Sequence, residues 1–325
     1  MPGLKEIAQV AGVSIRTVKR ALSQTGPVSE ETGRRVRAAA RRLEYRPNLA
    51  ARSLKTGASS EIVVLMHSTD ELHMDKLLGI ESVLRAAGFS VLVLFALSET
   101  EESHVAEAML TRRPAGAILF PAPSNRLQSM LSLILKQKLP YVVLDTRLEG
   151  VNAVRIDRAQ GVEEAVRHLA AQGRRHIAYV GPIADRSRLA GYERALAAFG
   201  MPSIVAETPA GSSGANEIEN AVRHLMRATP SPDAMQAYSD TLAMTLLRTL
   251  HALGARIPDE VAVVGFDNRA FASLAHPPLT TVAQPGRDIG EAAGTLLLRQ
   301  IAGEKPPAQG WTVTLSTRLI ARESA

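Results

Sequence analysis

The chain has 325 residues, which fits two to three domains, and 46% hydrophobic with 22% charged residues can bury a sizeable core. It has no cysteine, which excludes disulfide bridges, thiolate metal sites and a cysteine nucleophile. No apolar run reaches the length of a membrane span and the N-terminus lacks the pattern of a signal peptide, so we expect a cytoplasmic protein.

The positive charge is concentrated at the N-terminal end. Residues 1–60 hold 12 Lys and Arg against 4 Asp and Glu, whereas residues 61–325 hold 26 against 28. A basic segment of this kind is typical of a module that binds a polyanion such as DNA.

Within this basic segment, apolar residues recur at helical spacing. The pattern predicts helices over residues 4–11, 15–23 and 29–44, with Gly12 breaking the first and Ser29 capping the third. Two short helices joined by a glycine turn and followed by a third predict a helix-turn-helix unit.

The second helix of such a unit reads base edges in the major groove with its N-terminal residues. Arginine suits a bidentate contact to guanine, and isoleucine suits the thymine methyl group. The residues that we expect to contact DNA here are Ser14, Ile15, Arg16, Thr17, Lys19 and Arg20.

A short basic, alanine-rich segment follows the third helix. Pro47 ends that helix, Asn48 can cap a new one, and Leu54 is its large apolar residue. A helix this short is marginal alone in water, so we expect it to fold only against a partner or a ligand.

From residue 61 on, short apolar runs alternate with helical patterns. The expected strands cover 62–66, 91–95, 116–120, 141–144, 154–157, 176–180, 234–238 and 261–265, and the expected helices 74–87, 101–112, 126–138, 161–171 and 242–253. Repeated βαβ units predict parallel sheets covered by helices, with ligands bound beyond the carboxyl ends of the strands. Asp145 and Asp267 each end an apolar strand and are therefore candidates for a binding site.

The N-terminal pattern is similar to the DNA-binding headpiece of the lactose-repressor (LacI/GalR) family. The matching residues are the run Leu4 to Ser14, then Thr17, Val18, Arg20, Val28, Ser29, Thr32 and Tyr45 to Asn48. The resemblance implies that Ile15, Arg16 and Arg20 select the operator sequence. Lys19 departs from the serine that is usual in the family.

The same resemblance implies that the segment after Pro47 is the family's hinge helix, which folds when two subunits meet on the operator. Leu54 would wedge between base pairs in the minor groove, and Ala51 would pack against the paired hinge. The residues assigned to this DNA-bound hinge are Asn48, Ala51, Arg52 and Leu54.

The rest of the chain resembles the family's two-lobed core, which is like a periplasmic binding protein; the matching stretches are 173–182, 188–192, 257–267 and 278–284. The implied organisation is a headpiece over 1–46, a hinge and linker over 47–60, and a core over 61–325. We expect the chain to pass between the lobes near residues 155, 284 and 313, which gives lobe one about 61–155 and 284–312, and lobe two about 156–283 and 313–325.

The resemblance also implies an effector cleft between the lobes. The residues expected to line it are Leu72, His73, Asp145, Arg188, Ser239, Asp240, Asp267 and Gln284. Asp145 could instead cap a helix or serve a turn, Arg188 could pair with a structural carboxylate, and His73 could simply start a helix. Gly286 stands where many sugar-responsive members have an aromatic residue, and only 4% of the residues are aromatic, which argues against a stacked sugar.

The expected protein is therefore an α/β homodimer with an all-α helix-turn-helix headpiece. It would bind a near-palindromic operator as a transcriptional repressor, under the control of a small effector such as a sugar or related metabolite. No enzymatic activity, cofactor, metal or membrane is expected, since the histidines form no metal-binding pattern and no phosphate loop is present. The alternatives are a solute-binding or sensor protein of the same core fold, and a nucleoid-type protein that binds DNA without strong sequence choice.

Overall fold

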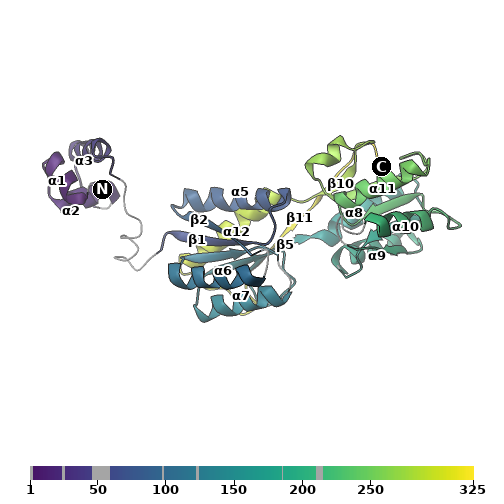
Figure 1. Cartoon of the computed structure of the whole chain (residues 1–325), viewed down its shortest axis with the longest axis horizontal. Coiled ribbons are helices and arrows are strands. Elements are labelled where there is room, and N and C mark those ends of the chain that lie inside the picture. The colour runs from purple at the N-terminus through teal and green to yellow at the C-terminus, as the bar shows by residue number, and fades with distance from the viewer. Residues whose placement is uncertain are drawn as a thin grey trace. The chain divides into compact units, whose positions relative to one another are not determined.

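The computed structural model describes residues 3–23, 26–45, 59–96, 99–121, 124–184, 186–209 and 215–325. The chain divides into two compact units, residues 1–60 and 61–325. The first unit is a helical headpiece and the second is a core of two α/β lobes (Figure 1). Across these described ranges, no helix combines the length and the apolar character needed to cross a membrane.

The headpiece contains α1 (Leu4–Ala11), α2 (Ile15–Ser23) and α3 (Glu30–Arg42). Its core takes one fully buried side chain from each helix, namely Ile7, Val18 and Val36. These are the positions at which the apolar periodicity of the three segments coincides, so the helices pack around one small core.

The prediction that the third helix extends to Glu44 is wrong by two residues. Glu44 has a left-handed backbone with φ of 48°, and the Tyr45 N–H donates to the Ala40 carbonyl at 2.9 Å. This hydrogen bond satisfies a free carbonyl at the helix end and turns the chain away, so α3 stops at Arg42.

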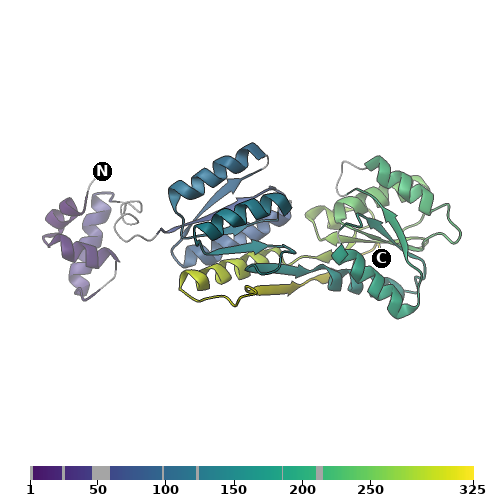
Figure 2. The same cartoon turned by 90° about the horizontal axis from the view of Figure 1, so that it is seen from below.

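Lobe one is built on a six-stranded parallel sheet in the order β11-β5-β4-β3-β1-β2. Its strands are β1 (Glu61–Met66), β2 (Ser90–Phe95), β3 (Gly116–Leu119), β4 (Tyr141–Leu144), β5 (Ala153–Asp157) and β11 (Thr312–Ser316). Its helices are α5 (Glu71–Ala86) and α12 (Gly286–Ile301) on one face, and α6 (Glu99–Arg112) and α7 (Ser124–Lys136) on the other. Figure 1 shows α5 on one side of this sheet and α6 and α7 on the other, and Figure 2 shows the same lobe from below.

Lobe two repeats this architecture with the sheet order β12-β10-β9-β8-β6-β7. Its strands are β6 (Ile177–Gly181), β7 (Ile204–Glu207), β8 (Ala234–Ala237), β9 (Ala262–Asp267), β10 (Thr280–Ala283) and β12 (Arg318–Ile320). Its helices are α8 (Arg158–Ala171) and α9 (Arg186–Phe199) on one face, and α10 (Ala215–Leu225) and α11 (Asp240–Ala252) on the other. All pairs are parallel except β12 with β10, because β12 leads away from the other lobe while β10 leads toward it.

The chain passes between the lobes at three places. The first passage follows Asp157 and the second follows Ala283, since α8 packs on the second sheet and α12 on the first. The third falls at Thr317 rather than near residue 313, because Thr312 to Ser316 pair with β5 in lobe one. The Thr317 hydroxyl donates to Gln160 Oε1 at 3.1 Å, which ties the third passage to the first.

Helix α5 begins at Glu71, three residues before the predicted start at Met74. The cause is a local cap: a carboxylate oxygen of Asp70 accepts the backbone N–H of His73 at 3.1 Å. The extra turn contains His73, which lies with Lys76 of the next turn at the end of lobe one that faces lobe two.

Candidate functional site

The outward face of α2 carries the residues predicted to contact DNA. Ser14 caps this helix, because its hydroxyl oxygen accepts the Thr17 N–H at 3.1 Å. Val18 and Ala21 point into the headpiece core. On the other face, Ser14, Ile15, Arg16 and Lys19 are exposed, and Thr17 and Arg20 are half-buried. The geometry therefore gathers an apolar side chain and three cations on one accessible helix face.

The turn before α2 is held by the other two helices. Gly12 has a φ of 63°, which closes α1 in the left-handed conformation that glycine adopts without strain. The Arg35 guanidinium of α3 donates to the Ala11 carbonyl at 2.7 Å. This bond fixes the end of α1, so the orientation of α2 is set by the packing of α3. The predicted hinge residues Asn48, Ala51, Arg52 and Leu54 lie outside the described residues.

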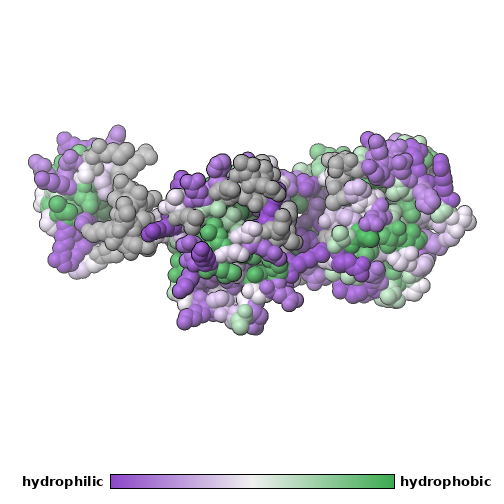
Figure 3. Space-filling model, turned by 60° about the horizontal axis from the view of Figure 1, so that its bottom comes forward, coloured by the Kyte–Doolittle hydropathy of each residue, from purple (hydrophilic) through white to green (hydrophobic). Residues whose placement is uncertain are grey.

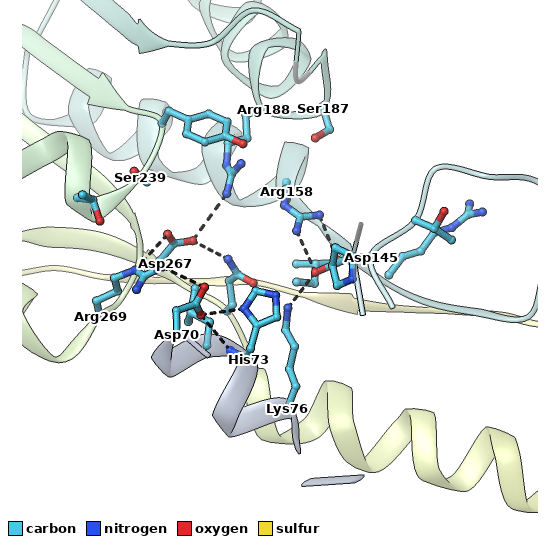
Figure 4. Close-up of a pocket in the computed structure, with 18 of the residues that line it drawn as sticks. Asp70, His73, Lys76, Asp145, Arg158, Ser187, Arg188, Ser239, Asp267 and Arg269 are labelled. Atoms are coloured by element: carbon cyan, nitrogen blue, oxygen red, sulfur yellow. Dashed lines mark hydrogen bonds and ion pairs between the residues drawn. The ribbon is translucent and has the colours of Figure 1, made fainter. Parts of the chain in front are cut away.

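The core contains a cleft of about 700 Å³ that is lined by residues from both lobes. Of the residues predicted for an effector site, seven line it: Leu72, His73, Asp145, Arg188, Ser239, Asp267 and Gln284. They come together because each follows the carboxyl end of a strand or begins the helix behind it, as parallel sheets require. Figure 4 shows five of them, His73, Asp145, Arg188, Ser239 and Asp267, converging from the two lobes.

Asp145 is the centre of a buried ionic cluster. Its carboxylate accepts hydrogen bonds from Lys76 Nζ at 2.9 Å and from both terminal nitrogens of Arg158 at 3.0 and 3.1 Å. Burial raises the pKa of Asp145, but Arg158 and Lys76 outweigh it and hold that pKa below the ordinary value. Lys76 and Asp145 belong to lobe one and Arg158 begins α8 in lobe two, so the cluster bridges the lobes.

A second cluster surrounds Asp267 at the end of β9. Gln284 Nε2 donates to its carboxylate at 2.6 Å, and nitrogen atoms of Arg188 and Arg269 lie 3.7 and 3.8 Å from it. Burial raises the pKa of Asp267, while Arg188 and Gln284 act in the opposite direction. Asp267 has a φ of 120°, an unusual backbone for a non-glycine residue, which places its side chain in the cleft.

Arg188 is held by aromatic rings as well as by charge. Its guanidinium carbon lies 4.0 Å from the ring centre of Tyr238 and 4.3 Å from that of Phe266. Two flanking rings fix the plane of the guanidinium and direct its nitrogens into the cleft.

His73 is packed rather than freely exposed. Its ring stacks on Phe120 with centroids 5.4 Å apart, and its Nδ1 lies 2.8 Å from the Asp70 carboxylate. Burial raises the pKa of Asp70, but the hydrogen bond from His73 outweighs it, and the pKa lies below its ordinary range. Asp70 therefore orients the imidazole toward the cleft.

Asp240 does not line the cleft, in contrast to the other predicted effector residues. Its side chain is fully buried, where it accepts the Thr281 hydroxyl and the backbone N–H of Arg269. Asp240 therefore fixes the backbone of Arg269 from the buried side, away from the cleft. Burial raises the pKa of Asp240 from 3.8 to about 7.

Asp240→Asn is expected to remove a pH-dependent loss of stability. Since the fold raises this pKa, protonated Asp240 favours the folded state, and that stability is lost as the pH rises through about 7. The wild type should lose about 2 kcal/mol from this group between about pH 5.5 and about pH 8. Urea unfolding at both pH values measures the difference. Parallel pH dependences of wild type and variant would contradict the assignment.

The structure also adds cleft residues that the sequence did not suggest. The charged residues among them are Asp70, Lys76, Arg147, Arg155, Arg158 and Arg269. Arg158 and Arg269 could have been identified as cleft candidates from the sequence, because each lies within two residues of the end of an apolar strand. Nothing in the sequence identified Lys76 as a cleft residue, since a lysine within a helix is normally solvent-exposed.

Both parts of the chain match known families. Residues 3–48 match the bacterial regulatory proteins of the lacI family, and residues 166–325 match the periplasmic binding protein-like domain. The HTH-type transcriptional regulator GntR of Pseudomonas aeruginosa is 34% identical, with 99% of this chain and 95% of that protein covered. A lac repressor dimer bound to operator and the anti-inducer ONPF superposes with a TM-score of 0.83 at 27% identity, covering 99% and 98% of the two chains. A complex of the transcriptional regulator CelR with cellobiose superposes with a TM-score of 0.73 at 28% identity over both full chains.

A helix-turn-helix headpiece joined to a two-lobed ligand-binding core defines a class of DNA-binding transcriptional regulators rather than enzymes. The chain belongs to the lacI family of bacterial regulatory proteins.

Proposed function

We propose that this regulator is a cytoplasmic homodimeric repressor that binds a near-palindromic operator and changes its operator affinity when a small molecule occupies the cleft. The observation that carries the proposal is the pairing of an exposed, basic α2 face with a cleft whose charged groups come from both lobes.

The α2 face supports a role in base reading. Ile15 is 42% exposed although it is apolar, and it stands beside Arg16 at the start of the helix. An exposed isoleucine gains nothing in the isolated headpiece, but it can pack on a thymine methyl group in the major groove. Arg16 can donate two hydrogen bonds to one guanine, and Lys19 and Arg20 add phosphate or base contacts. Asn48, Ala51, Arg52 and Leu54 would extend the contact into the minor groove.

The cleft supports control by an effector. Its two ionic clusters each include residues of both lobes: Arg158 reaches across to Asp145, and Arg269 lies 3.9 Å from Asp70. A molecule that inserts between these groups would change the relative orientation of the lobes, and with it the fraction of molecules able to hold DNA. A coupling of about 1–3 kcal/mol would change operator affinity about 5- to 150-fold.

Dimerisation is supported by apolar residues on the core surface. Patches of hydrophobic residues occur on both lobes, inside a hydrophilic border (Figure 3). On α5, Leu78 is 52% exposed and Met74 is also exposed. An apolar helix face of this kind is typical of a subunit interface. Two subunits related by a two-fold axis would present two headpieces to a palindromic site.

The decisive experiment selects genomic DNA fragments with the purified full-length protein and then measures binding of the best fragment and of random DNA across a salt series. We expect a symmetric consensus bound at least about a thousandfold more tightly than random DNA. Equal affinity for all DNA with a steep salt dependence would instead favour a nucleoid-type protein. Failure to bind DNA at all would favour a solute-binding protein of the same core fold.

Arg16→Ala is expected to weaken binding to the selected operator by about 1–3 kcal/mol and binding to random DNA far less. The reason is that a bidentate contact to a base exists only on the correct sequence. Arg16→Lys is the matched control: it keeps the charge but not the planar pair of donors, so only the preference for the operator should fall. Equal losses on operator and random DNA in Arg16→Ala, measured by fluorescence anisotropy, would rule out base reading by Arg16.

A further inference from the structure

The cleft carries a marked excess of positive charge. Among the described residues that line it, the cations are Lys76, Arg147, Arg155, Arg158, Arg188 and Arg269, and the carboxylates are Asp70, Asp145 and Asp267. Six cations face three carboxylates, without counting His73. The core as a whole is nearly neutral, so this excess is local to the cleft.

The carboxylates of the cleft already have their counter-charges. Asp145 is held by Lys76 and Arg158 together, and Asp267 lies near Arg188 and Arg269 together. Asp145 thus serves two cations, whereas Arg269 also lies 3.9 Å from Asp70, so the second cluster has two carboxylates for two cations. The excess positive charge therefore lies around Lys76, Arg155 and Arg158. A buried positive charge beyond these pairs is costly unless an anion neutralises it.

Unused hydrogen-bonding atoms point to a polar ligand in the same place. Arg155 donates from Nη2 to the Leu148 carbonyl, but its buried Nε has no hydrogen-bond partner among the described residues. The buried Oε1 of Gln284 likewise accepts no hydrogen bond within the described part of the chain. Ser187 and Ser239 also line the cleft at the starts of α9 and α11, where the positive ends of the helix dipoles favour an anion.

The aromatic rings near the cleft are already covered by protein groups. Arg188 lies over both Tyr238 and Phe266, and His73 covers Phe120. Gly286 supplies no side chain at the start of α12. The described lining therefore recognises a ligand through charge and hydrogen bonds rather than through stacking on a flat apolar ring face.

We propose that the effector is a small polyhydroxylated anion, a sugar acid or a sugar phosphate, whose anionic group is bound by the cleft cations Lys76, Arg155 and Arg158. This inference rests on the proposed effector function and specifies its chemical class. Hydroxyl groups of the ligand would donate to Gln284 and Asp267 and accept from Arg188. A carboxylate or a phosphate matches the planar donors of arginine, so both sources share one chemistry.

The test measures the melting temperature and calorimetric affinity of the full-length protein with three sets of compounds. The sets are neutral aldoses, the aldonates and uronates derived from them, and their phosphate monoesters. We expect a member of one anionic set to bind at least about tenfold more tightly than its neutral parent, since a charge-assisted bidentate contact is worth that much. Tighter binding of the sugar acids would identify a carboxylate as the anionic group, and tighter binding of the phosphate monoesters would identify a phosphate.

Two variants place the anion in the cleft rather than on the basic headpiece. Lys76→Gln removes a cation whose side chain is 4% exposed, and Arg85→Gln removes one on the same helix whose side chain is 73% exposed. Lys76→Gln should weaken the active anion at least about tenfold and reduce the salt dependence of its binding. Arg85→Gln should change neither. If Lys76→Gln fails to fold, the affinity of Arg158→Gln for the same anion tests the proposal instead.

The proposal is overturned if a neutral aldose gives the strongest binding, if no compound of either anionic set binds, or if Lys76→Gln and Arg158→Gln both bind the anion like the wild type. These outcomes are distinct from failure of the proposed function. A protein that binds its operator selectively and responds to a neutral sugar would remain a ligand-controlled repressor, whereas a protein without any operator preference would not.

Discussion

Asp145→Ala is expected to destabilise the core by about 3–5 kcal/mol, because it leaves Lys76 and Arg158 buried without their common counter-charge. The stabilisation that Asp145 provides has a defined pH window. Since the fold lowers its pKa, the contribution is present above the ordinary value of 3.8 and is lost as the pH falls below it. Urea unfolding near neutral pH measures the full loss.

Glu163 provides a matched control for this prediction. It also joins two arginines, with Arg167 at 2.8 Å and Arg194 at 3.1 Å, but both arginine side chains are more than half exposed. Surface pairs of this kind contribute about 0–1 kcal/mol, so Glu163→Ala should cost little. Similar losses in the two variants would show that burial does not determine how much the Asp145 cluster contributes to the free energy of unfolding.

The second large effect is expected at Gly290, where α12 crosses α5. A Cβ atom on Gly290 would lie 2.0 Å from the Lys76 carbonyl oxygen, and one on Gly79 would lie 2.2 Å from that of Arg287. The two helices thus approach through their backbones, which cannot move aside as a side chain can. Gly290→Ala should therefore cost about 3 kcal/mol, although alanine is the better helix former.

Gly294→Ala, one turn further along α12, is the comparison for this variant. A Cβ atom there would meet the side chain of Val83 at 3.0 Å rather than backbone. We expect a clearly smaller loss in the urea unfolding of this variant, because a 3.0 Å approach to Val83 requires a shift of only a few tenths of an ångström, whereas the 2.0 Å approach at Gly290 requires the two helices to separate. Since α5 carries His73 and Lys76 into the cleft, Gly290→Ala should also weaken effector binding. A stabilised Gly290→Ala protein would contradict the close contact.

Much of the headpiece could be predicted from sequence because its helices are specified locally. Caps at Ser14 and Ser29, the glycine turn and the 3.6-residue apolar period lie within a few residues of the contacts they determine. The sequence did not predict the end of α3, since a left-handed glutamate has no sequence signal as clear as a glycine would give.

In lobe two, the sequence pattern did not predict the edge strand β7, because only alternate residues are partly buried there.

The cleft was partly predictable for a different reason. Strand ends in βαβ units converge on one edge, so Asp145 and Asp267 could be placed from the pattern alone, without knowledge of their partners. The family resemblance supplied Leu72, His73, Arg188, Ser239 and Gln284, all of which line the cleft. It also suggested Asp240, whose burial behind Arg269 depends on the packing of α11 against β9 and β10.

Charge distribution and hydrophobic period are properties of neighbouring residues, so they predict a basic helix-turn-helix headpiece followed by parallel α/β units, whereas the division of the core into two lobes is implied by the family resemblance. Which charges meet depends on how distant segments of the chain fold together. Lys76 and Asp145 are separated by 69 positions in the sequence. The sequence around Lys76 does not indicate that this helix lysine is buried, because its burial results from the packing of the two lobes and the close crossing of α5 and α12. The cationic character of the cleft depends on such distant contacts, since the electrostatic energy of a group is set by what surrounds it in space.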